Sequence, residues 1–237
     1  MKTIGVFQLN QKKFDLLPFT GHWAATMGEP EANFSCIIYG NSGDGKTTFT
    51  VQLVKYLCTL DLKVGYVSEE EGISATMQKA FQRVNMHEVS GKITLIEQAT
   101  YDDIIGYFKK RGSPDVLVLD SLDYLSITKA QYQELRAALK NKIIIMLSWA
   151  TGRKPLTQAA RDIEYMVGVK LLVKQYIVYP RSRFGGNQPF VVWPERARLL
   201  NPEFFAKLDK QKQQGIIPFK PAENGDIEQK EGAKAGG

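Results

Sequence analysis

Continuous apolar runs of strand length recur along the middle of the chain, and segments with helical spacing of apolar residues separate them. Runs without polar alternation are typical of strands buried on both faces of a parallel sheet. They predict strands at residues 34–39, 62–68, 92–97, 115–120 and 142–148. The intervening pattern predicts helices at residues 48–57, 73–86, 102–111, 129–140 and 157–167. This alternation predicts an α/β fold with a mainly parallel central sheet flanked by helices.

The pattern changes in the last third of the chain. Two apolar stretches, 169–173 and 176–179, are separated by two polar residues, which predicts an antiparallel pair. A last strand is expected at 190–193, where Pro194 stops it, and a short helix at 203–213. We therefore expect an antiparallel C-terminal extension of the sheet.

The segment before the first core strand, residues 1–33, is apolar in patches. Ile4, Val6 and Leu9 favour a short strand, and an apolar cluster follows as far as Trp23. We expect this segment to pack on the core. The alternative is that its strand joins the sheet of a neighbouring subunit.

Composition completes the division of the chain into regions. After the N-terminal segment we expect a core at 34–200, a C-terminal segment at 201–219 and a tail at 220–237. The tail is dominated by Glu, Lys, Gln, Ala and Gly, a composition that predicts disorder.

The first core strand runs into a glycine-rich loop that has the G-x-x-x-x-G-K-T pattern of a phosphate-binding P-loop. Glycines allow backbone N–H groups to curl around phosphates, and the following helix points its N-terminus at them. Lys46 would contact the β- and γ-phosphates, and Thr47 would offer its hydroxyl to Mg²⁺. The predicted nucleotide contacts are Gly40, Asn41, Ser42, Gly43, Asp44, Gly45, Lys46, Thr47 and Thr48. The alternative is a glycine-rich turn that binds nothing.

Acidic residues follow two of the predicted strands. Asp120 ends the 115–120 strand, where a carboxylate would hold Mg²⁺, usually through water, opposite Thr47. The stretch 69–71 is Glu-Glu-Glu at the carboxyl end of another strand, the end that carries the chemistry in open α/β sheets. The alternatives are an ordinary turn aspartate and a solvated acidic turn.

Composition limits the other possibilities. The net charge of +6 over 237 residues is mildly basic, which permits nucleic-acid binding without arguing strongly for it. The only cysteines, Cys36 and Cys58, are far apart and the chain has two histidines, so no zinc-type cluster is expected. No run of apolar residues is long enough for a membrane span and no signal pattern begins the chain, so a cytoplasmic protein with no membrane partner is expected.

The order of these motifs over residues 34–194 resembles the RecA-like core ATPases, closest to the branch that holds RadA, DnaB helicases and KaiC. The resemblance implies a RecA-like P-loop NTPase fold, ATP and Mg²⁺ as ligands, and ATP hydrolysis. In this family the strand after the P-loop helix ends in the catalytic glutamate, a position that matches Glu70, with Glu69 and Glu71 as alternatives. The family often has Gln or His near position 149 to sense the γ-phosphate, whereas this chain has Trp149. Either Ser148 makes the polar contact or the sensing is weakened.

The turn that contains Arg181 and Arg183 is similar to the turns of RadA and DnaB whose cations reach ATP on the next subunit. The resemblance therefore implies arginine fingers and a homo-oligomer, ring or filament, with ATP at the subunit interfaces. Without the resemblance, these cations indicate a phosphate or nucleic-acid patch. The chain carries no four-cysteine module or helicase domain before the core, which makes it similar to small RecA-like proteins of phages and mobile elements.

Three further cations, Arg153, Lys154 and Arg161, fall where the family has its inner DNA-facing loop. The leading hypothesis is an ATPase that couples nucleotide state to single-stranded DNA in recombination, annealing or replication. A solvated basic loop is the alternative for these residues. A KaiC-like regulatory or scaffold ATPase with a protein partner is the second hypothesis. A small-molecule kinase is third, because the late antiparallel strands suit the RecA-like fold better.

Overall fold

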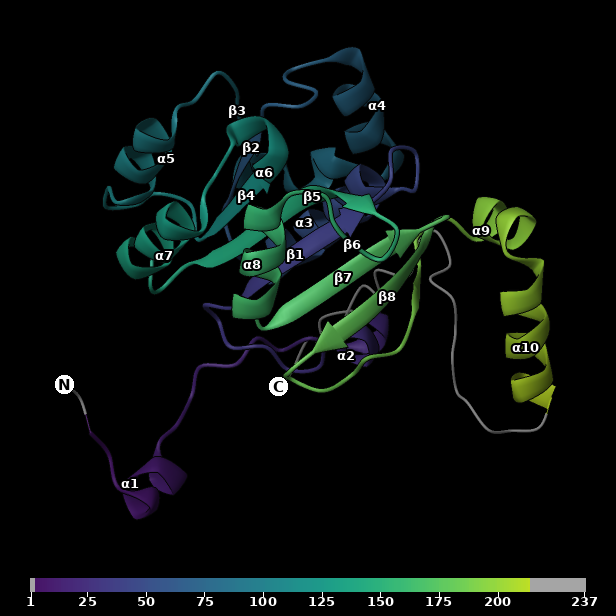
Figure 1. Cartoon of the computed structure of the whole chain (residues 1–237), viewed down its shortest axis with the longest axis horizontal. Helices are drawn as coiled ribbons and strands as arrows, with labels where there is room; N and C mark the ends of the chain where they lie inside the picture. The colour runs from purple at the N-terminus through teal and green to yellow at the C-terminus, as the bar shows by residue number, and fades with distance from the viewer. Residues whose placement is uncertain (1–2, 214–237) are drawn as a thin grey trace, which may run out of the picture.

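The computed structural model describes residues 3–213 and is organised around one nine-stranded sheet (Figure 1). The strands are β1 (Ser35–Gly40), β2 (Val64–Ser68), β3 (Ile93–Ile96), β4 (Val116–Asp120), β5 (Ile143–Thr151), β6 (Lys154–Pro155), β7 (Val169–Lys174), β8 (Ile177–Ser182) and β9 (Phe190–Val191). They lie in the order β3-β2-β4-β5-β1-β7-β8-β9, and β6 pairs with β5 off this path.

The sheet is parallel at its centre and antiparallel toward one edge. The pairs β2·β3, β2·β4, β4·β5, β1·β5 and β1·β7 are parallel. The pairs β7·β8, β8·β9 and β5·β6 are antiparallel. The predicted α/β class, with a parallel centre and an antiparallel C-terminal extension, is therefore confirmed.

Helices cover both faces of this sheet. They are α1 (Val6–Gln11), α2 (Gly21–Met27), α3 (Lys46–Thr59), α4 (Ala75–Arg83), the 3₁₀ helix η1 (Met86–Lys92), α5 (Tyr101–Phe108), α6 (Leu122–Leu125), α7 (Lys129–Ala138), α8 (Gln158–Met166), α9 (Pro194–Leu200) and α10 (Pro202–Gln213). Buried residues of α2, α3 and α4 pack on one face, and those of α5, α7 and α8 on the other. Within residues 3–213, no helix has the length and apolar character needed to cross a bilayer.

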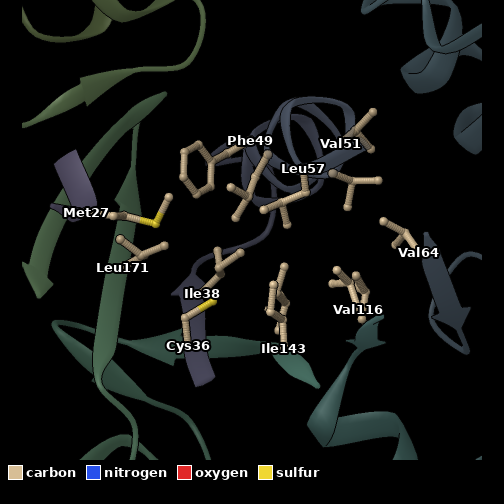
Figure 2. Close-up of a cluster of buried hydrophobic side chains, with 14 of the residues drawn as sticks. Met27, Cys36, Ile38, Phe49, Val51, Leu57, Val64, Val116, Ile143 and Leu171 are labelled. Carbon is tan, nitrogen blue, oxygen red and sulfur yellow. The ribbon is translucent and has the colours of Figure 1, made fainter. Parts of the chain in front are cut away.

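The side chains of β1 show how the two faces are filled. Cys36 and Ile38 join the cluster under α3, whereas Ile37 and Tyr39 join the cluster on the opposite face. Figure 2 shows the first cluster, in which Phe49 of α3 lies above Ile38. All these side chains are at most 1% exposed. An apolar run without alternation is thus explained by burial on both faces.

The strand predicted from Ile4, Val6 and Leu9 is wrong. Residues 6–11 form the helix α1, which buries no residue and lies apart from the sheet in Figure 1. Phe7 is 74% exposed. A strand needs a partner strand for its backbone hydrogen bonds, whereas a helical turn satisfies its own, and the apolar residues here do not alternate as a half-buried strand requires. Burial begins further along the segment, with Leu17 at 6% exposure.

Other differences concern the limits of elements. β5 continues three residues beyond the predicted end at Ser148, and α2, α6 and α9 were not predicted. The last strand, β9, ends at Val191 rather than at the predicted Trp193. Pro194 is not at its end but opens α9, at a position where its fixed φ suits the first helical turn. The predicted disordered tail at 220–237 lies outside the described residues.

Candidate nucleotide site

The predicted phosphate loop joins the carboxyl end of β1 to the N-terminus of α3. Gly43 and Gly45 have φ values of 79° and 99°, which only glycine adopts at little cost. A Cβ on Gly45 would lie 2.7 Å from a ring carbon of Tyr176, and one on Gly40 would lie 2.3 Å from the Val173 carbonyl oxygen. Glycine is therefore required at the pattern's first and last glycine positions by packing against the β7–β8 hairpin.

Asp44 fastens the loop to that hairpin. Its carboxylate accepts hydrogen bonds from the backbone N–H of Asn41 at 3.1 Å and of Gln175 at 2.9 Å. Its carbonyl accepts a third from the Tyr176 N–H at 2.9 Å. Gln175 and Tyr176 both have positive φ, which a two-residue hairpin turn demands. Asp44, predicted as a phosphate contact, thus also stabilises the turn between β7 and β8.

Lys46 is the first residue of α3 and is only 8% exposed. Its ammonium donates to the carbonyls of Gly40 at 3.0 Å and Asn41 at 3.1 Å. Burial lowers the pKa of Lys46, while nearby carboxylates, Glu70 first and then Asp120, oppose that shift. The structure therefore brings these three predicted residues within electrostatic reach of one another.

Asp120 ends β4 next to β2 and is 2% exposed. Burial raises the pKa of its carboxyl to about 7, and the charges of Glu70 and Glu71 add to the rise. The Tyr66 hydroxyl, which donates to Asp120 Oδ2 at 2.6 Å, and Lys46 act in the opposite direction. The peptide bond from Asp120 to Ser121 is cis.

The donors around Asp120 fit a magnesium ion. Among the described residues, Ser121 Oγ, Ser68 Oγ and Asp123 Oδ1 are buried oxygen atoms without a hydrogen-bond partner. Oxygen is the ligand atom that Mg²⁺ prefers. Throughout residues 3–213, no group of three His, Cys, Asp or Glu side chains is arranged to hold a metal. A magnesium ion at Asp120 and Thr47 would therefore need phosphate oxygens and water to complete its shell.

The three glutamates after β2 face different surroundings. The backbone N–H groups of Glu69 and Glu70 donate to the Asp120 carbonyl at 2.7 and 3.2 Å. Glu69 Oε1 accepts from the Ala99 N–H at 2.9 Å, on the side of the β3–α5 connection. The Glu70 carboxylate instead accepts from the indole N–H of Trp149. Glu71 is exposed. This geometry favours Glu70 for the predicted catalytic role.

Trp149 lies near the end of β5 and is partly buried. Its backbone N–H donates to Asp123 Oδ2 at 2.7 Å, and its ring meets the ring of Tyr124 edge to face at 5.6 Å. Trp149 departs from the family pattern, and its contact with Glu70 has no local signal in the sequence. The neighbouring Ser148 hydroxyl is buried and donates to the Trp149 carbonyl at 3.0 Å.

The three predicted nucleic-acid residues are not equivalent. Arg153 and Lys154 are exposed at the tip of the β5–β6 hairpin. The guanidinium of Arg161 donates from Nε to the Pro155 carbonyl at 2.8 Å and from Nη2 to the Leu156 carbonyl at 3.2 Å. Arg161 therefore supports the hairpin, whereas the side chains of Arg153 and Lys154 are exposed to solvent.

Arg181 and Arg183 are exposed and lie away from this chain's own P-loop. Across β7, Arg181 is level with Ile37 of β1, so it is about 10 Å from Gly40 along the strand direction at 3.3 Å per residue. The Arg183 N–H donates to the carbonyl of Gly168 at 3.0 Å, and the Gly168 N–H in turn donates to the carbonyl of Ser35, the first residue of β1. These cations are not brought together with Lys46.

A short turn fixes Arg183 in place. The Ser182 hydroxyl donates to the Met27 carbonyl at 2.7 Å, and the Asn187 N–H donates to the Thr26 carbonyl at 3.0 Å. Gly28 allows the close approach, because a Cβ there would lie 2.0 Å from the Phe184 carbonyl oxygen. The end of α2, which the sequence did not predict, therefore supports the basic turn.

The raised pKa of Asp120 makes a prediction for stability without metal. The folded protein keeps this proton up to about pH 7, whereas the unfolded chain loses it near the ordinary value of 3.8. Stability should therefore fall as pH rises between these values, by at most about 1.4 kcal/mol per pH unit. Asp120→Asn should remove this slope and, at pH 8 in EDTA, raise the free energy of unfolding by about 2 kcal/mol. Urea unfolding at pH 5 and pH 8 measures both effects.

The control for this prediction is Asp102→Asn, a neutralisation of an exposed carboxylate on α5. It should leave the pH dependence as in the wild type. Equal pH slopes for the wild type and Asp120→Asn would contradict the assignment of the titration to this buried carboxyl.

Comparison with known proteins gives a result for structure and none for sequence. No protein-family model matches the chain, and no curated protein matches it. Among solved structures, the chain is similar to a KaiC-like protein from the hyperthermophilic archaeon Pyrococcus horikoshii OT3, with a TM-score of 0.53 and 19% sequence identity. The match covers 70% of this chain and 88% of that one. At this identity the likeness concerns the fold: the chain has a RecA-like P-loop fold of the KaiC type.

Proposed function

We propose that the chain is a Mg²⁺-dependent ATPase whose nucleotide state is coupled to the binding of single-stranded DNA. The observation that carries this proposal is the convergence of Lys46, Asp120 and Glu70 at the carboxyl ends of the parallel strands β1, β4 and β2. A buried ammonium, a buried carboxylate and a hydrogen-bonded glutamate are the groups that phosphoryl transfer to water requires. The RecA-like fold supports the same conclusion.

Each of these residues has a defined role in the proposal. The loop amides and Lys46 would bind the phosphate chain, and Thr47 and Asp120 would hold Mg²⁺. The metal ion would neutralise negative charge on the phosphates. Glu70 would orient the attacking water and accept its proton.

Coupling to DNA is proposed from the β5–β6 hairpin. Arg153 and Lys154 are exposed at its tip, and β5 connects that tip directly to Trp149. Burial raises the pKa of Tyr39 to about 12, and both Arg181 and Arg153 oppose that rise, so both cations lie within electrostatic reach of Tyr39. A run of phosphates along this side would meet several positive charges.

The experiment that tests DNA coupling compares ATP turnover with and without single-stranded DNA. DNA is expected to stimulate the wild type. Replacing Arg153 and Lys154 by alanine should weaken DNA binding about tenfold at low salt and flatten its salt dependence, because two phosphate contacts are lost. Fluorescence anisotropy of a labelled oligonucleotide across a salt series measures both effects.

A double alanine variant of Lys109 and Lys110, exposed cations at the end of α5, is the matched control and should bind DNA as the wild type does. Equal losses in both variants would indicate non-specific charge attraction. Unchanged affinity in the Arg153 and Lys154 variant would remove the hairpin from the DNA site.

A regulatory ATPase with a protein partner is the second candidate function. The exposed apolar side chains of α1, among them Val6 and Phe7, favour a protein contact, and the matched solved structure is a KaiC-like protein. ATP turnover that ignores DNA and responds to a bound protein would support this candidate over the first.

We further propose that Arg181 and Arg183 act on ATP held by a neighbouring subunit. They lie toward the N-terminal half of β1, whereas their own P-loop begins at its carboxyl end. Arg183→Ala should lower turnover by about tenfold or more, since Arg181 remains beside it. Mixing this variant with Lys46→Met subunits should restore up to about a quarter of wild-type turnover, because some interfaces then combine an intact loop with an intact arginine. Mixtures without any restored turnover would contradict action between subunits.

A further inference from the structure

Trp149 contacts the proposed catalytic glutamate directly. The indole Nε1–H donates to Glu70 Oε1 at 3.1 Å and to Oε2 at 3.2 Å, so one N–H is shared between both carboxylate oxygens. The two residues are 79 positions apart in sequence and come from the ends of β5 and β2. Within residues 3–213, the indole is the side-chain group that hydrogen bonds to this carboxylate.

The indole is itself held in place from two sides. The backbone N–H of Trp149 donates to Asp123, and the indole ring packs against the ring of Tyr124. Both of these residues belong to α6, which begins two residues after Asp120, at Leu122. The Trp149 carbonyl accepts from the Leu156 N–H at 2.8 Å, which closes the β5–β6 hairpin. Trp149 therefore contacts α6, which follows β4, the Glu70 carboxylate, and Leu156 at the end of the β5–β6 hairpin.

Glu70 needs such support. It follows the last residue of β2 by two positions, in a segment without regular structure, and it is only partly buried. A glutamate side chain loses substantial rotamer freedom when it is fixed, and a hydrogen bond to a charged group is among the stronger ones available. A rigid indole that donates to both oxygens offsets part of this loss of freedom without placing a positive charge beside the carboxylate.

We propose that Trp149 is a positioning residue that orients the Glu70 carboxylate for proton transfer from water. This inference rests on the proposed ATPase function and adds to it. Trp149 does not act on the phosphate; it acts through Glu70. Trp149 also lies on the strand that leads into the hairpin of Arg153 and Lys154.

The test is a double-mutant cycle with Trp149→Phe and Glu70→Gln. Phenylalanine keeps a ring against Tyr124 and removes the N–H. Trp149→Phe should lower kcat about tenfold and leave KM within about twofold, because an oriented general base contributes to the chemical step. In the Glu70→Gln background the same change should alter turnover, measured with radiolabelled ATP, by less than about twofold.

Tyr107→Phe, a change at an exposed ring on α5, should leave kcat as in the wild type. An unchanged or increased kcat in Trp149→Phe would overturn the inference. Equal losses in both backgrounds would also overturn it, because a merely structural role does not depend on Glu70. A wild type without ATP turnover would instead contradict the proposed function itself.

A second measurement does not depend on activity. In ¹⁵N-tryptophan-labelled protein, the indole N–H signal that is missing in Trp149→Phe belongs to this residue. Glu70→Ala should shift that signal more than those of Trp23 and Trp193, since the carboxylate acceptor is lost. Equal or smaller movement of the Trp149 signal would contradict the hydrogen bond.

Discussion

Lys46→Met is expected to abolish nucleotide binding while leaving the protein folded. The ammonium is buried at the start of α3, where the loop carbonyls of Gly40 and Asn41 hold it within the P-loop. Two charged hydrogen bonds to phosphate oxygens contribute about 4 kcal/mol, so the affinity for ATP should fall by about 1,000-fold. Isothermal titration with a non-hydrolysable ATP analogue and Mg²⁺ measures this change.

The stability of this variant separates loss of function from loss of fold. Methionine retains the apolar stem of the lysine, and burial disfavours the ammonium, as the lowered pKa of Lys46 indicates. The thermal midpoint of the nucleotide-free protein should therefore stay the same or rise. Lys79→Met, on the exposed face of α4, is the matched control and should bind ATP normally. Retained affinity in Lys46→Met would remove this loop from the nucleotide site.

The elements that could be predicted from sequence are those whose cause is local. A run of buried residues defines each parallel strand, and the glycine pattern of the P-loop lies within eight consecutive positions. Asp120 could be identified because it ends such a run. The strand proposed around Val6 failed for the opposite reason: its pairing partner is not visible in the sequence, and the segment forms a helix.

The contacts that complete the site are long-range and have no local signature. Trp149 of β5 meets Glu70, which follows β2, across one intervening strand, β4. Asp44 meets the β7–β8 turn 131 residues later. The fold alone determines that Glu69 is bound by the Ala99 N–H and is directed away from Trp149. Likewise, a charge count does not reveal that Arg161 is bound to backbone carbonyls. Sequence therefore predicted which residue types the site holds, and the sheet topology decides which of them meet.

Glu70→Gln is expected to retain ATP binding and to slow hydrolysis by about 1,000-fold, within the range typical of a lost general base. Glutamine has nearly the same shape, and its amide oxygen still accepts from the Trp149 indole, so the fold around the site should persist. What is lost is the carboxylate that we propose as the acceptor of the proton from water. Steady-state turnover and analogue affinity, measured on the same preparation, separate these two effects.

The neighbouring glutamates provide matched controls for this prediction. Glu71→Gln removes an exposed charge and should change turnover less than about threefold, in keeping with a screened surface site. Glu69→Gln weakens the bond to the Ala99 N–H and should affect stability more than turnover, because its carboxylate faces the β3–α5 connection. Normal turnover in Glu70→Gln together with a large loss in Glu69→Gln would transfer the catalytic role to Glu69. It would also show that the indole of Trp149 binds a carboxylate with no part in the reaction.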